Sequence, residues 1–198
     1  MNLRCLRRVS ASAKAATYAL AILATAACSP ALNWREVSLE GLVALLPCKP
    51  DHAVRPVQLG SQNTVLQMAG CEAGGALYAI SHVHIADAAQ VGATQVAWRQ
   101  STLANLQASA VQTQSLPLAK LLPGKPQARA TGSTTGGSAA ADTTFNVEKL
   151  DGKRPDGTAV QARLAWLTKG QDIYHVAVYG AKLDQEMSEL LFSELRLQ

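Results

Sequence analysis

The sequence predicts an α+β fold, with a mainly antiparallel sheet, a long central helix and a C-terminal helix. Short apolar segments of alternating polarity recur between clusters of Gly, Pro, Asn and Asp, which is the pattern of antiparallel strands joined by turns. Residues 86–109 change to a helical period, and residues 184–197 do so again. Strands, a long helix, more strands and a short helix are the element order of an α+β domain.

Five strands are expected before the long helix. They span residues 34–37, 42–46, 54–60, 63–71 and 74–85. Pro47 and Pro50 stop the second strand because proline cannot donate to a strand ladder. Gly60 to Asn63 form the turn of a hairpin between the third and fourth strands, and residues 72–75 turn the chain into the fifth.

The long helix is expected within residues 86–109, with Asp87 as its N-cap. An apolar stripe can share one face of this helix, with Leu103 beside it. The stripe consists of Val91, Gln95, Trp98, Thr102 and Leu106.

A strand before Pro117 is expected after the helix. Residues 128–142 are mostly Gly, Ser, Thr and Ala without an apolar period, which predicts a flexible loop.

The last third of the chain predicts three strands and a helix. The strands span residues 143–152, 159–170 and 171–180, and the last two form a hairpin across Lys169-Gly170. Both faces of this hairpin carry apolar side chains, so both are expected to be buried or half-buried. The closing helix has an apolar stripe at Met187, Leu190, Leu191 and Leu195.

The first 27 residues have the three parts of an export signal. A basic start precedes the apolar run 15–27, which is shorter than the roughly 20 residues of a membrane span. Thr25-Ala26-Ala27-Cys28 resembles a bacterial lipobox, in which the cysteine receives a diacylglycerol and becomes the first residue. Thr25 departs from the usual Leu. The alternatives are a signal peptide cut after an Ala-x-Ala-like site, an uncleaved anchor, and a twin-arginine signal at Arg7-Arg8 that lacks the usual Phe-Leu.

The net positive charge of the chain lies in this leader. Residues 1–27 hold four of the 18 Lys and Arg residues and none of the 14 Asp and Glu residues, so the remaining chain carries 14 of each. A neutral domain without a basic patch argues against nucleic-acid binding. Apolar residues make up 48% of the chain and aromatics only 5%, so a mostly aliphatic core is expected.

The cysteine count also favours export. Cys5 is expected to leave with the signal and Cys28 to carry lipid, which leaves Cys48 and Cys71 as an even pair for an oxidising compartment. A disulfide between them would close a loop of about 24 residues and contribute on the order of 3 kcal/mol. Two unpaired buried thiols are the alternative. A catalytic dithiol is disfavoured because the pair lacks Cys-x-x-Cys spacing.

His82 and His84 are the best candidate for a metal site. Their spacing on a strand places both rings on one face, where they could bind Zn or Cu. No third ligand stands at a recognisable spacing; His52, Glu72 and Asp87 are the available partners. The alternative is a solvated polar strand end.

Other aromatic residues favour a structural role. His175 lies in an apolar strand and is expected to be a half-buried, hydrogen-bonded ring rather than a base. Trp34, Trp98 and Trp166 could line a cleft, but core packing suits Trp98 and Trp166 better. The sequence has no Gly-x-Ser-x-Gly and no His-Glu-x-x-His motif, so no catalytic residue is predicted.

Several segments carry a resemblance to known proteins. "GLVALLPCKPD", "ALYAISHV", "PDGTAVQARLAWLTKGQDIYHVAVYG" and "FSELRL" resemble a family of uncharacterised proteobacterial exported lipoproteins, and the element order resembles the PsbP-like α/β/α sandwich. The resemblance spans roughly residues 34–198. It implies a fold often used for docking onto other proteins, and it supplies no metal site that can be matched residue by residue.

The predicted organisation is a lipoprotein signal peptide at 1–27, a lipidated tether at 28–33 and one α+β domain at 34–198. The predicted function is a non-enzymatic envelope lipoprotein without a cofactor, held to the membrane through lipid and docking onto another envelope protein of unknown identity. Ser29 follows the lipidated cysteine. A residue other than Asp at this position usually directs a bacterial lipoprotein to the outer membrane, so the outer membrane is the expected location. The alternative is a periplasmic small-ligand or metal-binding module that uses His82 and His84.

Overall fold

The computed structural model describes residues 32–118 and 144–198. The chain divides into a unit Met1–Leu32 and a unit Asn33–Gln198, and the second is described below. The predicted signal peptide, the lipidation site Cys28 and the predicted loop at 128–142 lie outside the described residues.

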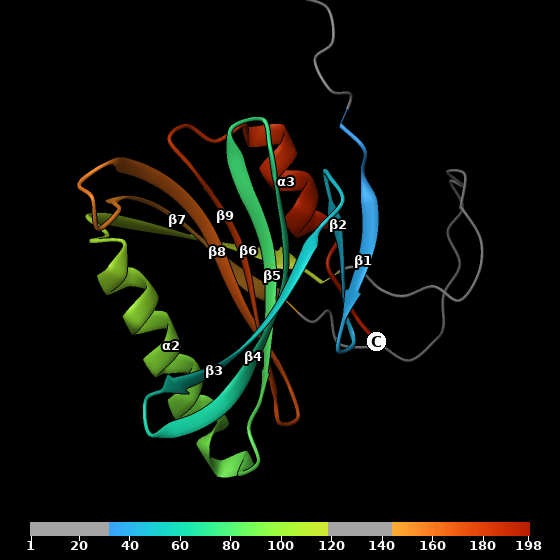
Figure 1. Ribbon diagram of the computed structural model, residues 1–198, viewed down its shortest axis with the longest axis vertical. Coiled ribbons are helices and arrows are strands. Elements are labelled where there is room, and N and C mark those ends of the chain that lie inside the picture. Colours follow the sequence, from blue (N-terminus) through green and yellow to red (C-terminus); the bar gives the residue numbers. More distant parts are fainter. Residues whose placement is uncertain (1–31, 119–143) are drawn as a thin grey trace, which may run out of the picture. The chain divides into compact units, whose positions relative to one another are not determined.

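The domain is a mixed α+β fold with mostly antiparallel sheets, as predicted (Figure 1). Its large sheet has seven strands in the order β3-β4-β5-β9-β8-β7-β6, each antiparallel to its neighbours. These strands are β3 (Asp51–Leu59), β4 (Gln62–Ala73), β5 (Ala76–His84), β6 (Ala110–Pro117), β7 (Thr144–Lys153), β8 (Ala159–Lys169) and β9 (Asp172–Gly180). A three-stranded sheet has the order β1-β2-β10 and consists of β1 (Arg35–Leu39), β2 (Leu42–Leu46) and β10 (Arg196–Leu197).

Two hairpin turns of the large sheet form where the sequence predicted them. The pairs Leu59↔Gln62 and Lys169↔Asp172 leave two-residue connections between β3 and β4 and between β8 and β9. Gly60 and Gly170 both have φ of +60°, a backbone conformation that short hairpin turns require and that glycine adopts without a steric penalty.

Helix α2 (Val91–Asn105) packs on one face of the large sheet. A short 3-10 helix, η2 (Ala88–Gln90), precedes it, and the Asp87 carboxylate caps η2 by accepting from the Ala89 N–H at 2.9 Å. Val91 and Trp98 pack with Val83 of β5 and Ile173 of β9. The predicted stripe is therefore confirmed at Val91 and Trp98, whereas Gln95 and Thr102 are only half-buried.

The opposite face of the large sheet is covered by α3 (Gln185–Ser193) and the small sheet (Figure 1). Asp184 caps α3 by accepting from the Met187 N–H at 3.0 Å. The prediction of a helix as far as Leu197 is wrong: α3 ends at Ser193, and the chain continues into β10, which pairs with β2. The buried residues of the helix are Ser188, Leu191 and Phe192.

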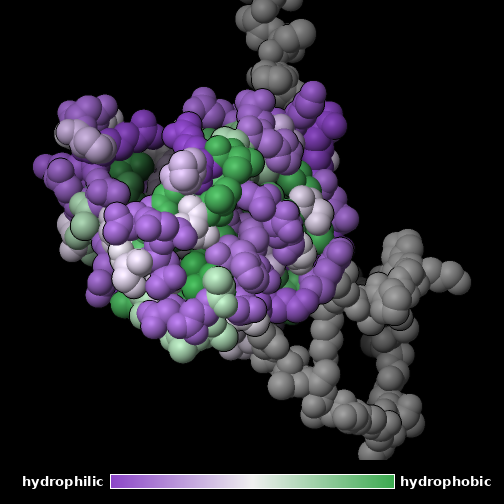
Figure 2. Space-filling view, turned by 60° about the horizontal axis from the view of Figure 1, so that its bottom comes forward, coloured by the Kyte–Doolittle hydropathy of each residue, from purple (hydrophilic) through white to green (hydrophobic). Residues whose placement is uncertain are grey.

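The central strands are therefore buried on both faces, as the sequence of the β8–β9 hairpin predicted. Tyr174, Val176 and Val178 of β9 belong to the core on the α3 side, and Ile173 and Ala177 belong to the cores on the α2 side. On the face in Figure 2, hydrophobic residues are interrupted by hydrophilic ones. Among the residues described, no helix has the length and apolar character needed to span a membrane.

Candidate functional site

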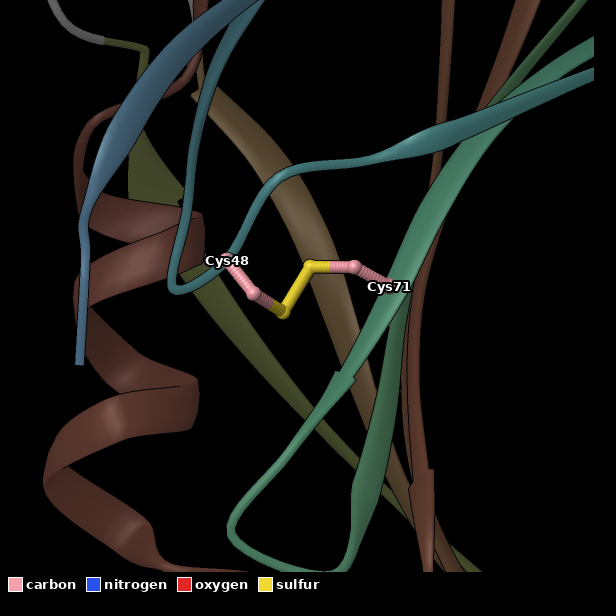
Figure 3. Close-up of a disulfide and its surroundings, with 2 residues drawn as sticks. All are labelled: Cys48 and Cys71. Carbon is pink, nitrogen blue, oxygen red and sulfur yellow. A yellow bond between two sulfur atoms is a disulfide. The ribbon is translucent and has the colours of Figure 1, made fainter. Parts of the chain in front are cut away.

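The predicted disulfide between Cys48 and Cys71 is present (Figure 3). Cys48 follows β2 of the small sheet, Cys71 lies within β4 of the large sheet, and their Cα atoms are 6.0 Å apart, a usual separation for a disulfide. The bond therefore links the two sheets covalently. It leaves no free thiol for catalysis at either position.

His82 and His84 lie on one face at the end of β5, as their spacing predicted, and Asp172 joins them from β9. In the antiparallel register His84 is paired with Asp172 and His82 with Tyr174. His82 Nε2 and His84 Nδ1 each lie 2.9 Å from Asp172 Oδ1, so one carboxylate oxygen accepts from both rings. Asp172 could not be predicted from the sequence as a partner of these histidines. It is 88 residues from His84 in the chain, and the two side chains come together only because β5 pairs with β9.

The two rings differ in their exposure. The side chain of His82 is 5% exposed and that of His84 is 58% exposed. Burial raises the pKa of the Asp172 carboxyl, but hydrogen bonds from His82 and His84, together with their charge, lower it below its ordinary value overall. Asp172 is therefore ionised at neutral pH and holds both rings in place.

Tyr174 closes the inner side of this cluster. Its ring lies 5.1 Å from the His82 ring between centroids, and its hydroxyl donates to the Glu40 carbonyl at 2.6 Å. Burial, with the charges of Asp172 and Glu40, raises the pKa of Tyr174 to about 12, so the phenol keeps its proton. His82 Nδ1 is buried without a hydrogen-bond partner. The cluster is a hydrogen-bonded anchor between β5 and β9 with one ring open to solvent.

The cluster falls short of a complete metal site. Within residues 32–118 and 144–198, no group of three or more His, Cys, Asp or Glu side chains is arranged to hold a metal ion. Of the partners considered from sequence, His52 pairs with Ala69 in the β3–β4 hairpin, Glu72 lies in β4, and Asp87 caps η2. Metal binding at His82 and His84 stays a prediction, and Asp172 contacts both rings through hydrogen bonds without completing a three-ligand site in this geometry.

His175 is buried between two tryptophan rings. Its ring stacks on Trp166 at 4.6 Å and meets the edge of Trp98 at 5.3 Å. The expectation of a half-buried, hydrogen-bonded ring is wrong, since His175 is buried and its Nε2 has no partner. Burial lowers the pKa of His175 to about 3, so the ring is neutral near pH 7. Trp98 and Trp166 pack in the cores, as predicted.

Comparison of the sequence with models of protein families found no match, and comparison with curated proteins found no relative.

Proposed function

We propose that this chain is an exported bacterial lipoprotein whose folded domain is a non-enzymatic docking module for another envelope protein. The Cys48–Cys71 disulfide carries the proposal. Structural disulfides form and persist in oxidising compartments outside the cytosol. Residues 1–27 add the basic, apolar and small-residue parts of an export signal, and Cys28 stands at the lipobox position.

The proposed anchor holds the domain close to the membrane. A lipidated Cys28 would begin the mature chain, and β1 begins at Arg35. The tether at 28–33 spans at most about 20 Å when fully extended, because each residue adds no more than about 3.6 Å. Because Ser29 follows the lipidated cysteine, the proposed location of the anchor is the periplasmic face of the outer membrane.

The proposed docking role rests on the resemblance to the PsbP-like α/β/α sandwich. The layer order supports that resemblance, since α2 packs on one face of the seven-stranded sheet and α3 with the small sheet packs on the other. The resemblance implies a fold often used for docking onto other proteins.

Metabolic labelling with a palmitate analogue tests the anchor. The full chain should incorporate label and remain with membranes, whereas Cys28→Ala should lose both properties. Cys5→Ala is the matched control, because Cys5 is removed with the signal and its loss should leave labelling unchanged. An unlabelled wild-type protein released into the periplasm would overturn the proposal.

Mild crosslinking of the same membranes tests docking. It should give one adduct of defined mass, and a monomer alone would count against docking.

The convergence of His82 and His84 on Asp172 favours a second candidate, a periplasmic metal-binding module. Imidazole nitrogens and a carboxylate oxygen form a donor set that suits Zn²⁺. The purified protein should then retain close to one equivalent of Zn²⁺ or Cu²⁺ by elemental analysis. His82→Ala and Asp172→Asn should abolish retention and His52→Ala should not. Metal-free wild-type protein with undiminished thermal stability would rule this candidate out.

A further inference from the structure

A cavity of about 210 Å³ lies on the α3 side of the large sheet, away from the His82–His84 cluster. It is bounded by α3 and by strands β6, β7 and β8, and all its lining residues belong to the described part of the chain. Seven of its eleven lining residues have polar side chains. They include Gln112 of β6, Lys149 of β7, Gln161 and Arg163 of β8, and Gln185 and Ser188 of α3.

Arg163 is a buried charge with too few partners. The residue is 4% exposed, and its Nη1 donates to Ser188 Oγ at 2.8 Å. Its Nε and Nη2 are buried and have no hydrogen-bond acceptor among the residues that the structure describes. The nearest carboxylate oxygen, Glu189 Oε1, is 3.7 Å from Nη2 and belongs to a side chain that is 45% exposed. Since a guanidinium offers five N–H groups, most of its donor capacity is unused.

This arrangement is energetically costly unless an anion completes it. Burial of a charged group without a hydrogen-bonded counter-charge costs several kcal/mol, which is why fully buried arginines are almost always paired. The Phe192 ring, with its centroid 5.7 Å from the Arg163 Cζ atom, offers a cation–π contact but accepts none of the free N–H groups. Within the protein the guanidinium therefore has only one long ion pair, to the half-exposed Glu189 carboxylate, and most of its N–H groups remain available.

A second cation stands next to the first. Lys149 of β7 is directly paired with Arg163 of β8, so the two side chains share one face of the sheet. Like charges in directly opposed positions of neighbouring strands destabilise a sheet. Gln112 of β6 is in turn paired with Lys149, which continues the row with an amide. The row therefore consists of one amide and two opposed cations, and it ends at Val178 of β9, which is paired with Arg163. It suits a ligand with a negative charge and a hydrogen-bonding group.

A carboxylate on the same sheet wall of the cavity limits the ligand. Asp151 lies there and accepts from Gln161 Nε2 at 3.2 Å, and Gln161 Oε1 accepts from the Leu183 N–H at 3.1 Å. A carboxylate at that end disfavours a ligand that is negatively charged throughout. The volume is below the usual range of pockets for drug-sized ligands, about 300–1,000 Å³, and so favours a small molecule.

We propose that this cavity binds a small organic carboxylate, with the carboxylate between Arg163 and Lys149 and the remainder of the molecule among Gln112, Gln161 and Gln185. The planar fork of arginine matches a carboxylate in two parallel hydrogen bonds, and lysine adds a point charge beside it. This site is independent of the lipid anchor and of docking, so its failure leaves the proposed function in place.

Calorimetric titration of the purified protein with L-glutamine and with L-lactate, which each carry one carboxylate, tests the site, at constant ionic strength set with sodium chloride because exposed charges are screened by salt. Saturable binding is expected for at least one of them. Lys149→Gln should weaken it about tenfold, and Arg163→Gln should weaken it by more than tenfold, because a hydrogen-bonded charge is lost in each case. Lys49→Gln is the matched control and should bind like the wild type, since Lys49 does not line this cavity.

Three results would overturn the proposal. One is the absence of any saturable heat with both carboxylates. Another is equal binding by Lys149→Gln, Arg163→Gln and the wild type. The third is saturable binding of inorganic phosphate without binding of either carboxylate, which would assign the cavity to a different anion. Circular dichroism of each variant shows whether it is folded, and Lys149→Gln keeps the test decisive if Arg163→Gln does not fold, because Lys149 is less deeply buried.

Discussion

At the scale of single residues, burial decides the behaviour of His175. The ring is enclosed by Trp98 and Trp166, and its pKa is lowered to about 3 because the charged form would lose its hydration there. An unfolded chain returns this histidine to its ordinary pKa of 6.5. Between these two values the unfolded state binds a proton that the folded state does not bind, so the free energy of unfolding depends on pH.

We therefore expect the free energy of unfolding to fall as the pH falls from about 6.5 towards 3, with His175 contributing at most about 1.4 kcal/mol per pH unit. The contribution of the residue to the slope vanishes as the pH rises well above 6.5, where the unfolded histidine is also neutral. His175→Phe keeps an aromatic ring between the tryptophans and removes the titration, so its unfolding free energy should vary less with pH. Urea unfolding at several values between pH 7.5 and 4.5 measures the slope.

The pH window separates His175 from Asp172, whose lowered pKa affects stability only in more acidic solution. His52→Gln is the control, because His52 is exposed and its replacement should leave the slope as it is in the wild type. Equal slopes for His175→Phe and the wild type would show that the pKa of His175 is not lowered by the fold.

At the scale of elements, local sequence predicted most of the strands and both helices. Strand β2 occupies the predicted residues 42–46, since an apolar run ends there at a proline. The end of α3 was missed because Leu191 and Leu195 keep helical spacing. Leu195 nevertheless lies beyond the helix, in the segment that leads to β10, and pairing of β10 with β2 is a long-range event that periodicity does not report.

Gly152 illustrates a constraint that acts between elements. It lies in β7, where glycine usually weakens a strand, and it faces the carbonyl of Leu106 at the end of α2. The next residue, Lys153, donates its N–H to that carbonyl at 2.6 Å. A side chain at position 152 would hold the two elements apart. The glycine is therefore explained by the approach of α2 to the strand, which is invisible in the local sequence.

The candidate sites likewise depend partly on local sequence patterns and partly on contacts between distant strands. The shared face of His82 and His84 follows from the two-residue period of a strand, and the disulfide follows from the cysteine count. Asp172 beside the histidines and Lys149 beside Arg163 depend on which strands become neighbours. Arg163 did carry a local signal, a charge within a strand whose two faces both looked buried, and such a charge is itself a sign of a functional site.

At the scale of the whole molecule, two of the ties between the small sheet and the large one lie on either side of β2. The Cys48–Cys71 disulfide lies just after the end of β2, and the hydrogen bond from Tyr174 to the Glu40 carbonyl lies just before its start. Between the two ties, Leu42, Ala44 and Leu46 of β2 pack in the same core as β9 and α3. The disulfide therefore adds to an interface that is already apolar and does not create it.

Removal of the disulfide should consequently weaken the domain without unfolding it. Cys48→Ala/Cys71→Ala is expected to lower the free energy of unfolding by about 3 kcal/mol, the chain-entropy value for a loop of this length, with the far-ultraviolet circular dichroism of the folded protein unchanged. Urea unfolding measures the difference. A reductant should shift the wild-type midpoint to that of the double variant and leave the variant unaffected, which separates loss of the bond from general effects of the reductant. An unshifted wild-type midpoint, or two thiols that react with a probe before reduction, would mean that the bond does not hold the two sheets together in solution.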